Sequence, residues 1–408
     1  MSNKKGLNFS KKIMNSRNFI SNNIKLLKDC SSSEIGSKIK NLKIISEKIG
    51  CPVPKTLIII TKSFHQLLIE NKIFDPLNYD WSKFQIPIEY QKIILKKIKQ
   101  EFNNKALVIR SSATCEDSPL LSFAGQYSSF LNIKGKEKIL KAIKLCYQSL
   151  FSDNARVYAK MSGVRLEYES MAIAIQELIP VTIAGVIFTA DPIDKNYKKM
   201  VAEYTMGLGD SITSGHKKPI RKEIEKIKAN KLKPSFLKKL VKIALDIEDL
   251  FETPQDIEWG WNNHQIYIFQ SRSITTLNNH PKITSYVFNR HKIIGRGTPV
   301  CKGVGEGFLR IINNNQDYDK IKKGEIVLIK CKPDISLIKK IQLINALIVR
   351  GGVLSHIAVI AREFNVPCLT EPIIIAKKIE KYIGKKIIVD AIKGKILLKK
   401  NETTTSYL

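Results

Sequence analysis

The sequence lacks the residue patterns that mark several large classes of protein. Its seven cysteines are scattered and form no Cys-x-x-Cys pair, so neither a disulfide framework nor a cysteine-based zinc site is predicted. Histidine is scarce, with six residues and no metal-ligand spacing. No apolar run approaches the roughly 20 residues that a membrane-spanning helix needs. The N-terminus is polar and rich in lysine, so no secretory signal is expected and the predicted location is the cytoplasm.

Acidic residues are few relative to basic ones. Lys and Arg number 68 against 37 Asp and Glu, which gives a formal net charge of +31. Such an excess is typical of nucleic-acid-binding proteins. Here, however, the lysines are spread through every predicted helix among Ile and Asn, with no aromatic-basic stripe and no nucleic-acid motif. A general compositional bias is the simpler explanation. Nucleic acid is therefore not the expected partner, although a basic surface would attract anionic substrates.

The 408 residues leave room for two or three domains, each with its own core. Hydrophobic residues make up 43% and charged residues 26%, as in an ordinary globular protein. Residues 1–33 are rich in Lys, Asn and Ser and are expected to form a polar arm or helix. The patterns that bear on function follow this arm.

Residues 350–369, RGGVLSHIAVIAREFNVPCL, predict a glycine turn followed by a short apolar helix. Ser355 is a suitable N-cap, and Asn365 is a suitable left-handed stop. His356 then lies at the helix N-terminus, where the dipole disfavours imidazolium and keeps the ring neutral and nucleophilic. The same N–H groups would stabilise a phosphoryl group on that ring. From these residues alone, a purely structural histidine remains the alternative.

A second pattern begins at residues 106–109, which read as a short buried strand. This strand delivers Arg110 and two serines into a loop of small residues that later contains Gly125 and Gln126. Arginine is a multi-donor cation, hydroxyls donate hydrogen bonds, and glycine allows close backbone approach, so the loop suits anion binding. On physical grounds alone, a phosphate-binding loop and an ordinary loop are equally supported.

Two alternating apolar segments, residues 256–259 and 266–272, flank Asn-Asn-His and predict a β-hairpin. With residues 263–265 as the turn, Glu258 lies opposite Gln270 and Asp256 opposite Arg272, all on one face. A carboxylate beside a carboxamide oxygen, with an arginine one step along, can hold Mg²⁺ and an ATP phosphate. The alternative is an ion-pair ladder on the surface.

Two weaker patterns complete the set. Lys38 follows Gly36 at a predicted helix start, where it could contact phosphate or simply be solvated. The apolar strand from Met171 ends at Gln176 and Glu177, with Ile179 just beyond, and such a strand end could present backbone groups to an adenine.

Together these motifs resemble the phosphoenolpyruvate-utilising enzymes: phosphoenolpyruvate synthase, pyruvate phosphate dikinase and rifampicin phosphotransferase. The resemblance rests on RSSAT-x-ED with SFAGQ, on DIEW followed by QSR, and on the Gly-Gly, Ser-His and Ala-Arg-Glu pattern, in the family order over residues 34–400. Departures include Ser273 in place of the usual Pro, and Leu369-Thr370-Glu371 after the final Pro.

The resemblance implies a role for each matching residue. His356 becomes the phosphoryl acceptor, and Arg110 and Arg272 assist the transfer. ATP contacts fall on Lys38, Arg110, Gly125, Gln126, Gln176, Glu177, Ile179 and Arg272. Glu258 and Gln270 become the ligands of Mg²⁺.

The implied fold class is α/β (α+β), with an ATP-grasp-like nucleotide-binding domain and a small β/β/α swivelling phosphohistidine domain. The expected bounds are 34–275 for the ATP-binding domain, 276–294 for a linker and 295–402 for the phosphohistidine domain. No third, acceptor-binding domain is recognised in the sequence.

The implied activity is that of an ATP-dependent dikinase-type phosphotransferase. Mg-ATP phosphorylates His356 with release of AMP and phosphate, and the phosphoryl group passes to a small acceptor such as pyruvate or another carboxylate or hydroxyl compound. The acceptor site is expected on a partner chain or at the domain cleft. The alternative is a self-phosphorylating phosphocarrier or regulatory module that makes no small product.

Overall fold

The computed structural model describes residues 20–116, 129–207, 219–227, 232, 234–274, 291–331, 335–349, 356–370 and 378–399. The chain forms two compact units, Met1–Thr182 with Ile257–Ser273, and Ile183–Asp256 with Ile274–Leu408. The first unit thus takes a short return segment from far along the chain. The domain boundaries that the sequence predicts, near residues 34, 275 and 295, stay predictions.

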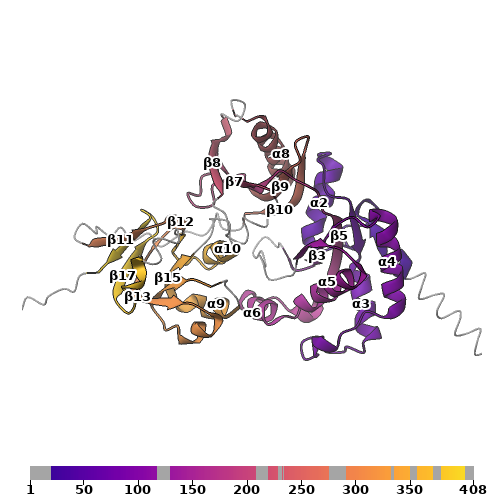
Figure 1. Ribbon diagram of the computed structural model, residues 1–408, viewed down its shortest axis with the longest axis horizontal. Helices are drawn as coiled ribbons and strands as arrows, with labels where there is room; N and C mark the ends of the chain where they lie inside the picture. The colour runs from indigo at the N-terminus through magenta and orange to yellow at the C-terminus, as the bar shows by residue number, and fades with distance from the viewer. Residues whose placement is uncertain are drawn as a thin grey trace, which may run out of the picture. The chain divides into compact units, whose positions relative to one another are not determined.

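The first unit contains an antiparallel sheet of order β1-β2-β5-β3-β4 (Figure 1). Its strands are β1 (Ile24–Leu26), β2 (Thr56–Ile59), β3 (Leu107–Ala113), β4 (Ser129–Ile133) and β5 (Met171–Glu177). The central strands β3 and β5 are buried on both faces, as their continuous apolar runs predict. Arg110 is the one residue of β3 that is not fully buried. This places a cation at the edge of an apolar core.

Helices cover this sheet and bury an aromatic cluster. They are α2 (Ser37–Lys48), α3 (Thr61–Glu70), α4 (Ile88–Phe102), α5 (Lys136–Ser149) and α6 (Asp153–Ser162), with 3₁₀ turns at Leu27–Asp29, Trp81–Lys83 and Leu166–Tyr168. Phe64 stacks on Tyr147, with ring centroids 5.3 Å apart, and Trp81 stacks on Phe151 at 4.8 Å. Such stacked pairs add to the stabilisation from burial alone. The cluster fixes α3 and α5 against the sheet that carries Arg110.

A second sheet has the order β10-β9-β6-β7-β8. Its strands are β6 (Ile183–Phe188), β7 (Lys199–Met206), β8 (Ile220–Glu225), β9 (Gln255–Trp261) and β10 (Ile266–Ser273). Strands β6, β7 and β8 pair antiparallel in sequence order. Helix α8 (Ser235–Phe251) precedes β9 and buries an apolar stripe at Leu237, Leu240, Val241, Ala244 and Ile247.

The second unit contains an eight-stranded sheet of order β11-β18-β17-β13-β14-β15-β16-β12. Its strands are β11 (Lys292–Arg296), β12 (Thr298–Cys301), β13 (Val304–Ile312), β14 (Glu325–Ile329), β15 (Ile344–Val349), β16 (Cys368–Thr370), β17 (Lys386–Asp390) and β18 (Lys395–Leu398). Strands β13 to β16 run parallel, and β17 and β18 form an antiparallel hairpin. Helices α9 (Ile335–Lys340) and α10 (His356–Glu363) lie between the parallel strands in sequence, with 3₁₀ turns at Asn315–Lys320 and Ile341–Leu343.

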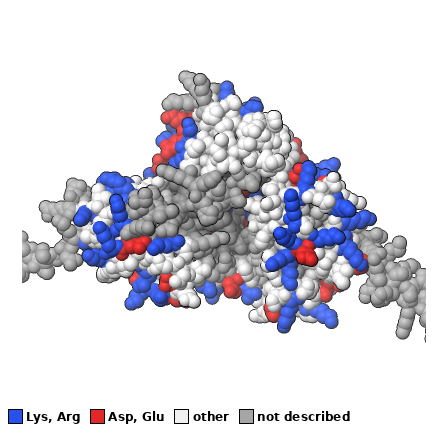
Figure 2. Space-filling view, in the orientation of Figure 1, with Lys and Arg blue, Asp and Glu red and all other residues white. Residues whose placement is uncertain are grey.

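Two surface properties follow from the described residues. None of their helices is both long enough and apolar enough to cross a membrane. On the face drawn in Figure 2, Lys and Arg side chains are dispersed, with Asp and Glu among them, rather than gathered in one stripe.

Candidate active site

Arg110 lies in the middle of β3 with its guanidinium directed at the β9–β10 hairpin of the same unit. Its Nη1 is 3.5 Å from Glu258 Oε2 and donates to the carbonyl of Phe269 at 3.4 Å. The side chain is only 12% exposed, and its buried Nε has no hydrogen-bond partner among the described residues. A buried unpaired donor is costly. An arginine held this way is suited to an anionic ligand that completes its hydrogen bonds.

The start of α2 is fixed against the end of β3. Gly36 is the N-cap of this helix, and a Cβ added there would lie 2.0 Å from the carbonyl oxygen of Ser112. The Ile39 N–H donates to Ser112 Oγ at 3.3 Å, and Ser37 Oγ donates to the carbonyl of Thr114 at 3.1 Å. Only glycine permits this approach. The contacts place Lys38, in the first turn of α2, beside the strand that carries Arg110.

Helix α2 also contacts β10. Asn41 Nδ2 donates to the carbonyl of Ser271 at 2.9 Å, between Gln270 and Arg272 in sequence. Gln270 is buried and Arg272 is half-buried. The structure therefore brings the start of α2, the Arg110 side chain and strand β10 to one region of the first unit.

The predicted β9–β10 hairpin is present, with an irregular register. Near the turn, the Asn262 N–H donates to the carbonyl of Gln265 at 3.3 Å. At the other end, the Ile274 N–H donates to the carbonyl of Pro254 at 2.8 Å. These two bonds differ by one residue in register, so the hairpin contains a β-bulge between them. The register that the sequence predicts holds at the outer end, and the direct opposition of Glu258 and Gln270 stays a prediction.

The oxygens of Glu258 and Gln270 are of the kind that Mg²⁺ prefers. Glu258 is 39% exposed and lies 3.5 Å from Arg110 Nη1, so its carboxylate is accessible to a ligand. No group of three or more His, Cys, Asp or Glu side chains suited to a metal occurs among the described residues. Two oxygen ligands from the protein fit an ion that takes its remaining ligands from phosphate and water. This donor set fits Mg²⁺ bound together with a nucleotide.

The end of β5 uses its polar groups within the protein. Gln176 is buried, and its Nε2 donates to Thr56 Oγ1 at 3.1 Å. The Glu177 side chain is 2.6 Å from Lys105 Nζ, and the Glu177 N–H donates to the carbonyl of Lys55 at 3.0 Å. Ile179, just beyond, is buried. Any contact of this segment with an adenine would therefore involve backbone groups rather than the Gln176 side chain.

Helix α10 begins at His356, directly after residues 350–355, which lie outside the described residues. The helix ends as predicted: Asn365 has φ 53°, and the Val366 N–H donates back to the carbonyl of Ala361 at 2.8 Å. This is the left-handed helix stop for which asparagine is suited. Ser355 and the His356 side chain are not described, so the capping and protonation of this histidine stay predictions.

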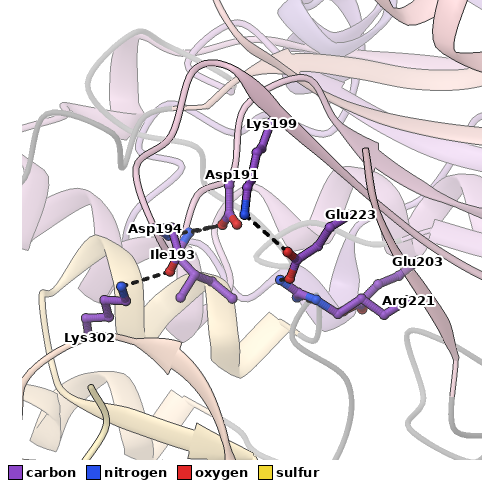
Figure 3. A network of polar contacts seen from close by, with 8 residues as sticks. All are labelled: Asp191, Ile193, Asp194, Lys199, Glu203, Arg221, Glu223 and Lys302. Carbon is purple, nitrogen blue, oxygen red and sulfur yellow. Dashed lines mark hydrogen bonds and ion pairs between the residues drawn. The ribbon is translucent and has the colours of Figure 1, made fainter. Parts of the chain in front are cut away.

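Strands β7 and β8 carry a polar network within the second unit (Figure 3). Glu203 is 2% exposed and accepts from Arg221 Nη1 at 3.3 Å, while its Oε2 has no hydrogen-bond partner among the described residues. Burial raises the pKa of Glu203, although Arg221 and Arg362 oppose this effect. Arg221 also lies 3.5 Å from Glu223, which pairs with Lys199 at 3.5 Å.

The same view shows a turn after β6. Asp191 Oδ1 accepts from the backbone N–H groups of Ile193 and Asp194, at 2.8 and 3.0 Å. The Asp194 carboxylate is 2.8 Å from Lys302 Nζ. This ion pair ties the loop that precedes β13 to the loop that follows β6.

Sequence reasoning missed one contact of this site, and two residues that it predicted are not described by the structure. Glu116, part of the RSSAT-x-ED motif, forms an ion pair with Lys38 at 2.6 Å. The motif itself was the available signal, but nothing in the sequence links it to a lysine 78 positions earlier. Gly125 and Gln126, the predicted nucleotide-covering residues, lie outside the described residues.

Comparison with protein families identifies two regions of the chain. The model of the pyruvate phosphate dikinase AMP/ATP-binding domain matches residues 82–228 and 217–290, which together make more than half of the chain. The model of the mobile domain of PEP-utilising enzymes matches residues 321–394, which include α10. The residues gathered around Arg110 thus belong mainly to the AMP/ATP-binding region. The expected fold class, α/β with an ATP-grasp-like nucleotide-binding domain, is confirmed.

Curated relatives carry names from the same family. The chain is 30% identical over 337 residues to the probable phosphoenolpyruvate synthase of Archaeoglobus fulgidus, covering 73% of this chain and 44% of the relative. It is 28% identical to the phosphoenolpyruvate synthase of Pyrococcus furiosus, covering 75% and 44%, and 30% identical to the rifampicin phosphotransferase of Bacillus cereus, covering 61% and 35%. The chain therefore spans less than half the length of these relatives.

Solved structures give weaker matches. A dinucleotide-forming acetyl-coenzyme A synthetase of Ca. Korarchaeum cryptofilum matches 64% of this chain and 97% of its own, with 12% identity and a TM-score of 0.31. The assignment rests instead on the two family models and on the order of their motifs. The chain belongs to the pyruvate phosphate dikinase family, with an AMP/ATP-binding domain followed by the mobile domain of PEP-utilising enzymes.

Proposed function

We propose that this chain is an ATP-dependent dikinase-type phosphotransferase in which His356 carries the phosphoryl group. The observation that supports it most directly is the pairing of Arg110 with Glu258 beside an unpartnered, buried Arg110 Nε. This arrangement holds a cation and a carboxylate together in the unit that contains most of the AMP/ATP-binding match. Phosphoryl transfer needs that combination, because positive groups must neutralise charge as the phosphate moves.

In the first step the imidazole of His356 attacks the β-phosphorus of ATP. The bond from that phosphorus to the oxygen bridging the α-phosphate breaks, and AMP leaves with the bond's electron pair. Arg110, Arg272 and Lys38 bind the phosphate oxygens and hold them in line with the histidine. Mg²⁺ held by Glu258 and Gln270 would supply charge neutralisation on these oxygens. The product is a pyrophosphoryl group on His356.

In the second step water or phosphate removes the terminal phosphoryl group from this adduct. The single phosphoryl group left on His356 then passes to a small-molecule acceptor such as pyruvate, or to another carboxylate or hydroxyl compound. Because one histidine serves both ATP and the acceptor, the domain that carries it has to move between two sites. The acceptor site is proposed to lie on a partner chain.

The first test is product analysis with purified chain, ATP and Mg²⁺, beside the His356→Ala variant. We expect AMP formation and acid-labile phosphate on the wild-type protein, with both lost in the variant. Arg110→Lys, which keeps the charge but loses the arginine fork, should slow AMP formation by about 10²-fold. ADP as the sole product, or equal turnover by His356→Ala, would overturn the proposal.

A further inference from the structure

Lys38 has an environment unlike that of an ordinary lysine in the first turn of a helix. Its side chain is 11% exposed, although α2 begins only one residue earlier. Its Nζ is 2.6 Å from Glu116 Oε1, and the Glu116 side chain is 2% exposed. Because a buried charge is stable only when it is paired, this contact accounts for the placement of both residues.

The carboxylate of Glu116 is oriented by the turn that follows β3. The Ala113 N–H donates to Glu116 Oε2 at 3.4 Å, and the Glu116 N–H donates to the carbonyl of Ala113 at 3.4 Å. One carboxylate oxygen therefore faces the backbone and the other faces Lys38. The side chain is fixed by its own turn and has no need of the lysine to adopt this direction.

The two elements that carry the pair are joined independently of it. Ser112 accepts the Ile39 N–H, and its carbonyl lies against Gly36, so the start of α2 and the end of β3 form one rigid corner. Arg110 and Ser112 are two residues apart on β3 and so face the same side of the strand, about 7 Å from each other. The pair thus lies where the start of α2 meets the end of β3, the strand that also carries Arg110.

We propose that Glu116 is a positioning residue that holds the Lys38 ammonium where it can bind a phosphate of the nucleotide. The inference rests on the proposed function, because it takes ATP as the ligand. An ammonium has three N–H donors, and the bond to Glu116 leaves two for phosphate oxygens. Glu116 acts through Lys38 and does not itself touch the nucleotide, since its negative carboxylate and a negative phosphate would repel each other.

The test is a double-mutant cycle on ATP affinity, with Glu116→Gln, Lys38→Met and the two combined. ATP and adenosine are titrated separately by calorimetry, because adenosine has no phosphate to contact Lys38. We expect Glu116→Gln to weaken ATP binding about tenfold, within the coupling range of contacting residues, and to leave adenosine binding unchanged. In the Lys38→Met background the Glu116 change should have no further effect.

Controls separate a positioning role from structural damage. Glu325→Gln breaks an ion pair of similar length in the second unit, between Glu325 and Arg310 at 2.5 Å, and should alter neither affinity. Thermal unfolding of every variant reports folding. Should Glu116→Gln fail to fold, Glu116→Asp takes its place, since it keeps the charge but withdraws it from the lysine, and the same loss of ATP affinity is expected.

Several outcomes would overturn the inference. Equal losses of ATP and adenosine affinity would show a structural role only, and additive effects in the double variant would show that Glu116 acts apart from Lys38. Unchanged ATP affinity in Lys38→Met would show that Lys38 does not bind a phosphate of ATP. In that case, AMP formation by the wild type would still support the proposed function. Conversely, coupled effects of the two substitutions on ATP affinity, without AMP formation by the wild type, would support the positioning role of Glu116 and contradict the dikinase reaction.

Discussion

The guanidinium of Arg110 has only part of its hydrogen-bonding capacity used by the described residues. Nη1 has a carboxylate and a carbonyl as neighbours, whereas the buried Nε has no hydrogen-bond partner among the described residues. Leaving such a donor unpaired costs about 1–3 kcal/mol. A site that binds an anion recovers this cost when the ligand arrives. The sequence predicted the residue and its charge, but the orphaned nitrogen could be recognised only in the folded structure.

Glu203 offers a prediction at the same scale. Burial raises its pKa above the ordinary 4.5, so the folded protein retains this proton to a higher pH than the unfolded chain does. The free energy of unfolding of the wild type therefore falls as the pH rises from 4.5 through the raised pKa of Glu203. The glutamine of the Glu203→Gln variant does not titrate. We expect the unfolding free energy of the variant, relative to wild type, to increase as the pH rises above 4.5. Urea unfolding followed by circular dichroism measures this difference.

Glu325 provides a control, because its pKa is shifted in the direction opposite to that of Glu203. Burial tends to raise its pKa, but hydrogen bonds from Arg310 and the Lys322 backbone outweigh burial and hold the pKa below 4.5. Its contribution to stability is present above the unfolded pKa and is lost as the pH falls. The relative stability of Glu325→Gln should therefore decrease as the pH rises. A pH-independent difference for Glu203→Gln would contradict the assignment of a buried, proton-retaining carboxyl.

At the scale of elements, sequence patterns predicted the features that depend on residues close together along the chain. Alternation predicted the β9–β10 hairpin, and Asn365, two residues after α10, was predicted as a left-handed stop, which its φ of 53° confirms. The bulge in the hairpin was not predicted, because register also depends on tertiary packing. A Cβ on Gly260 would lie 2.7 Å from the side chains of both Phe269 and Val181, and no local pattern encodes that crowding.

Contacts between distant elements were likewise beyond the sequence. Lys38 was predicted as a helix-start lysine with a solvated alternative, and its burial against Glu116 excludes that alternative. Gln176 was predicted at an adenine-binding strand end, whereas its side chain is buried against Thr56. In both cases the decisive neighbour lies far away along the chain, and hydrophobic periodicity carries no information about it.

A substitution at Gly36 tests the close packing between the start of α2 and the end of β3. An alanine Cβ would lie 2.0 Å from the carbonyl oxygen of Ser112, a backbone atom that cannot move without shifting the strand. We expect Gly36→Ala to lower the free energy of unfolding by about 1–3 kcal/mol. Because Lys38 moves with the helix, ATP affinity should fall as well. Urea unfolding and ATP titration measure the two effects.

The matched control for this change is Gly163→Ala. Gly163 has φ 70° at the end of α6, and no atom lies within 4 Å of an added Cβ. Backbone strain alone should then cost about 1 kcal/mol and leave ATP affinity unchanged. If Gly36→Ala behaved like this control, the corner would not be the element that positions Lys38.

At the scale of the whole molecule, charge and family membership point to different partners. The excess of Lys and Arg suits any anionic ligand, and on the face drawn in Figure 2 these side chains are interspersed with Asp and Glu. The two matched domains are an AMP/ATP-binding domain and the mobile domain of PEP-utilising enzymes, which point to a nucleotide as one partner. In the proposed reaction, the molecule that receives the phosphoryl group still has to be identified by experiments on the purified chain.

The last prediction concerns turnover by the 408-residue chain. If the acceptor site lies on a partner chain, phosphorylated His356 has no outlet when the chain is alone. AMP should then form as a burst of about one per chain and stop, because each chain offers a single acceptor histidine. Rapid quench with labelled ATP measures the burst, and His356→Ala should show none. Adding pyruvate or simple hydroxyl compounds should leave the burst amplitude unchanged. Steady AMP formation, or phosphoenolpyruvate made from pyruvate by the chain alone, would place the acceptor site within this chain instead.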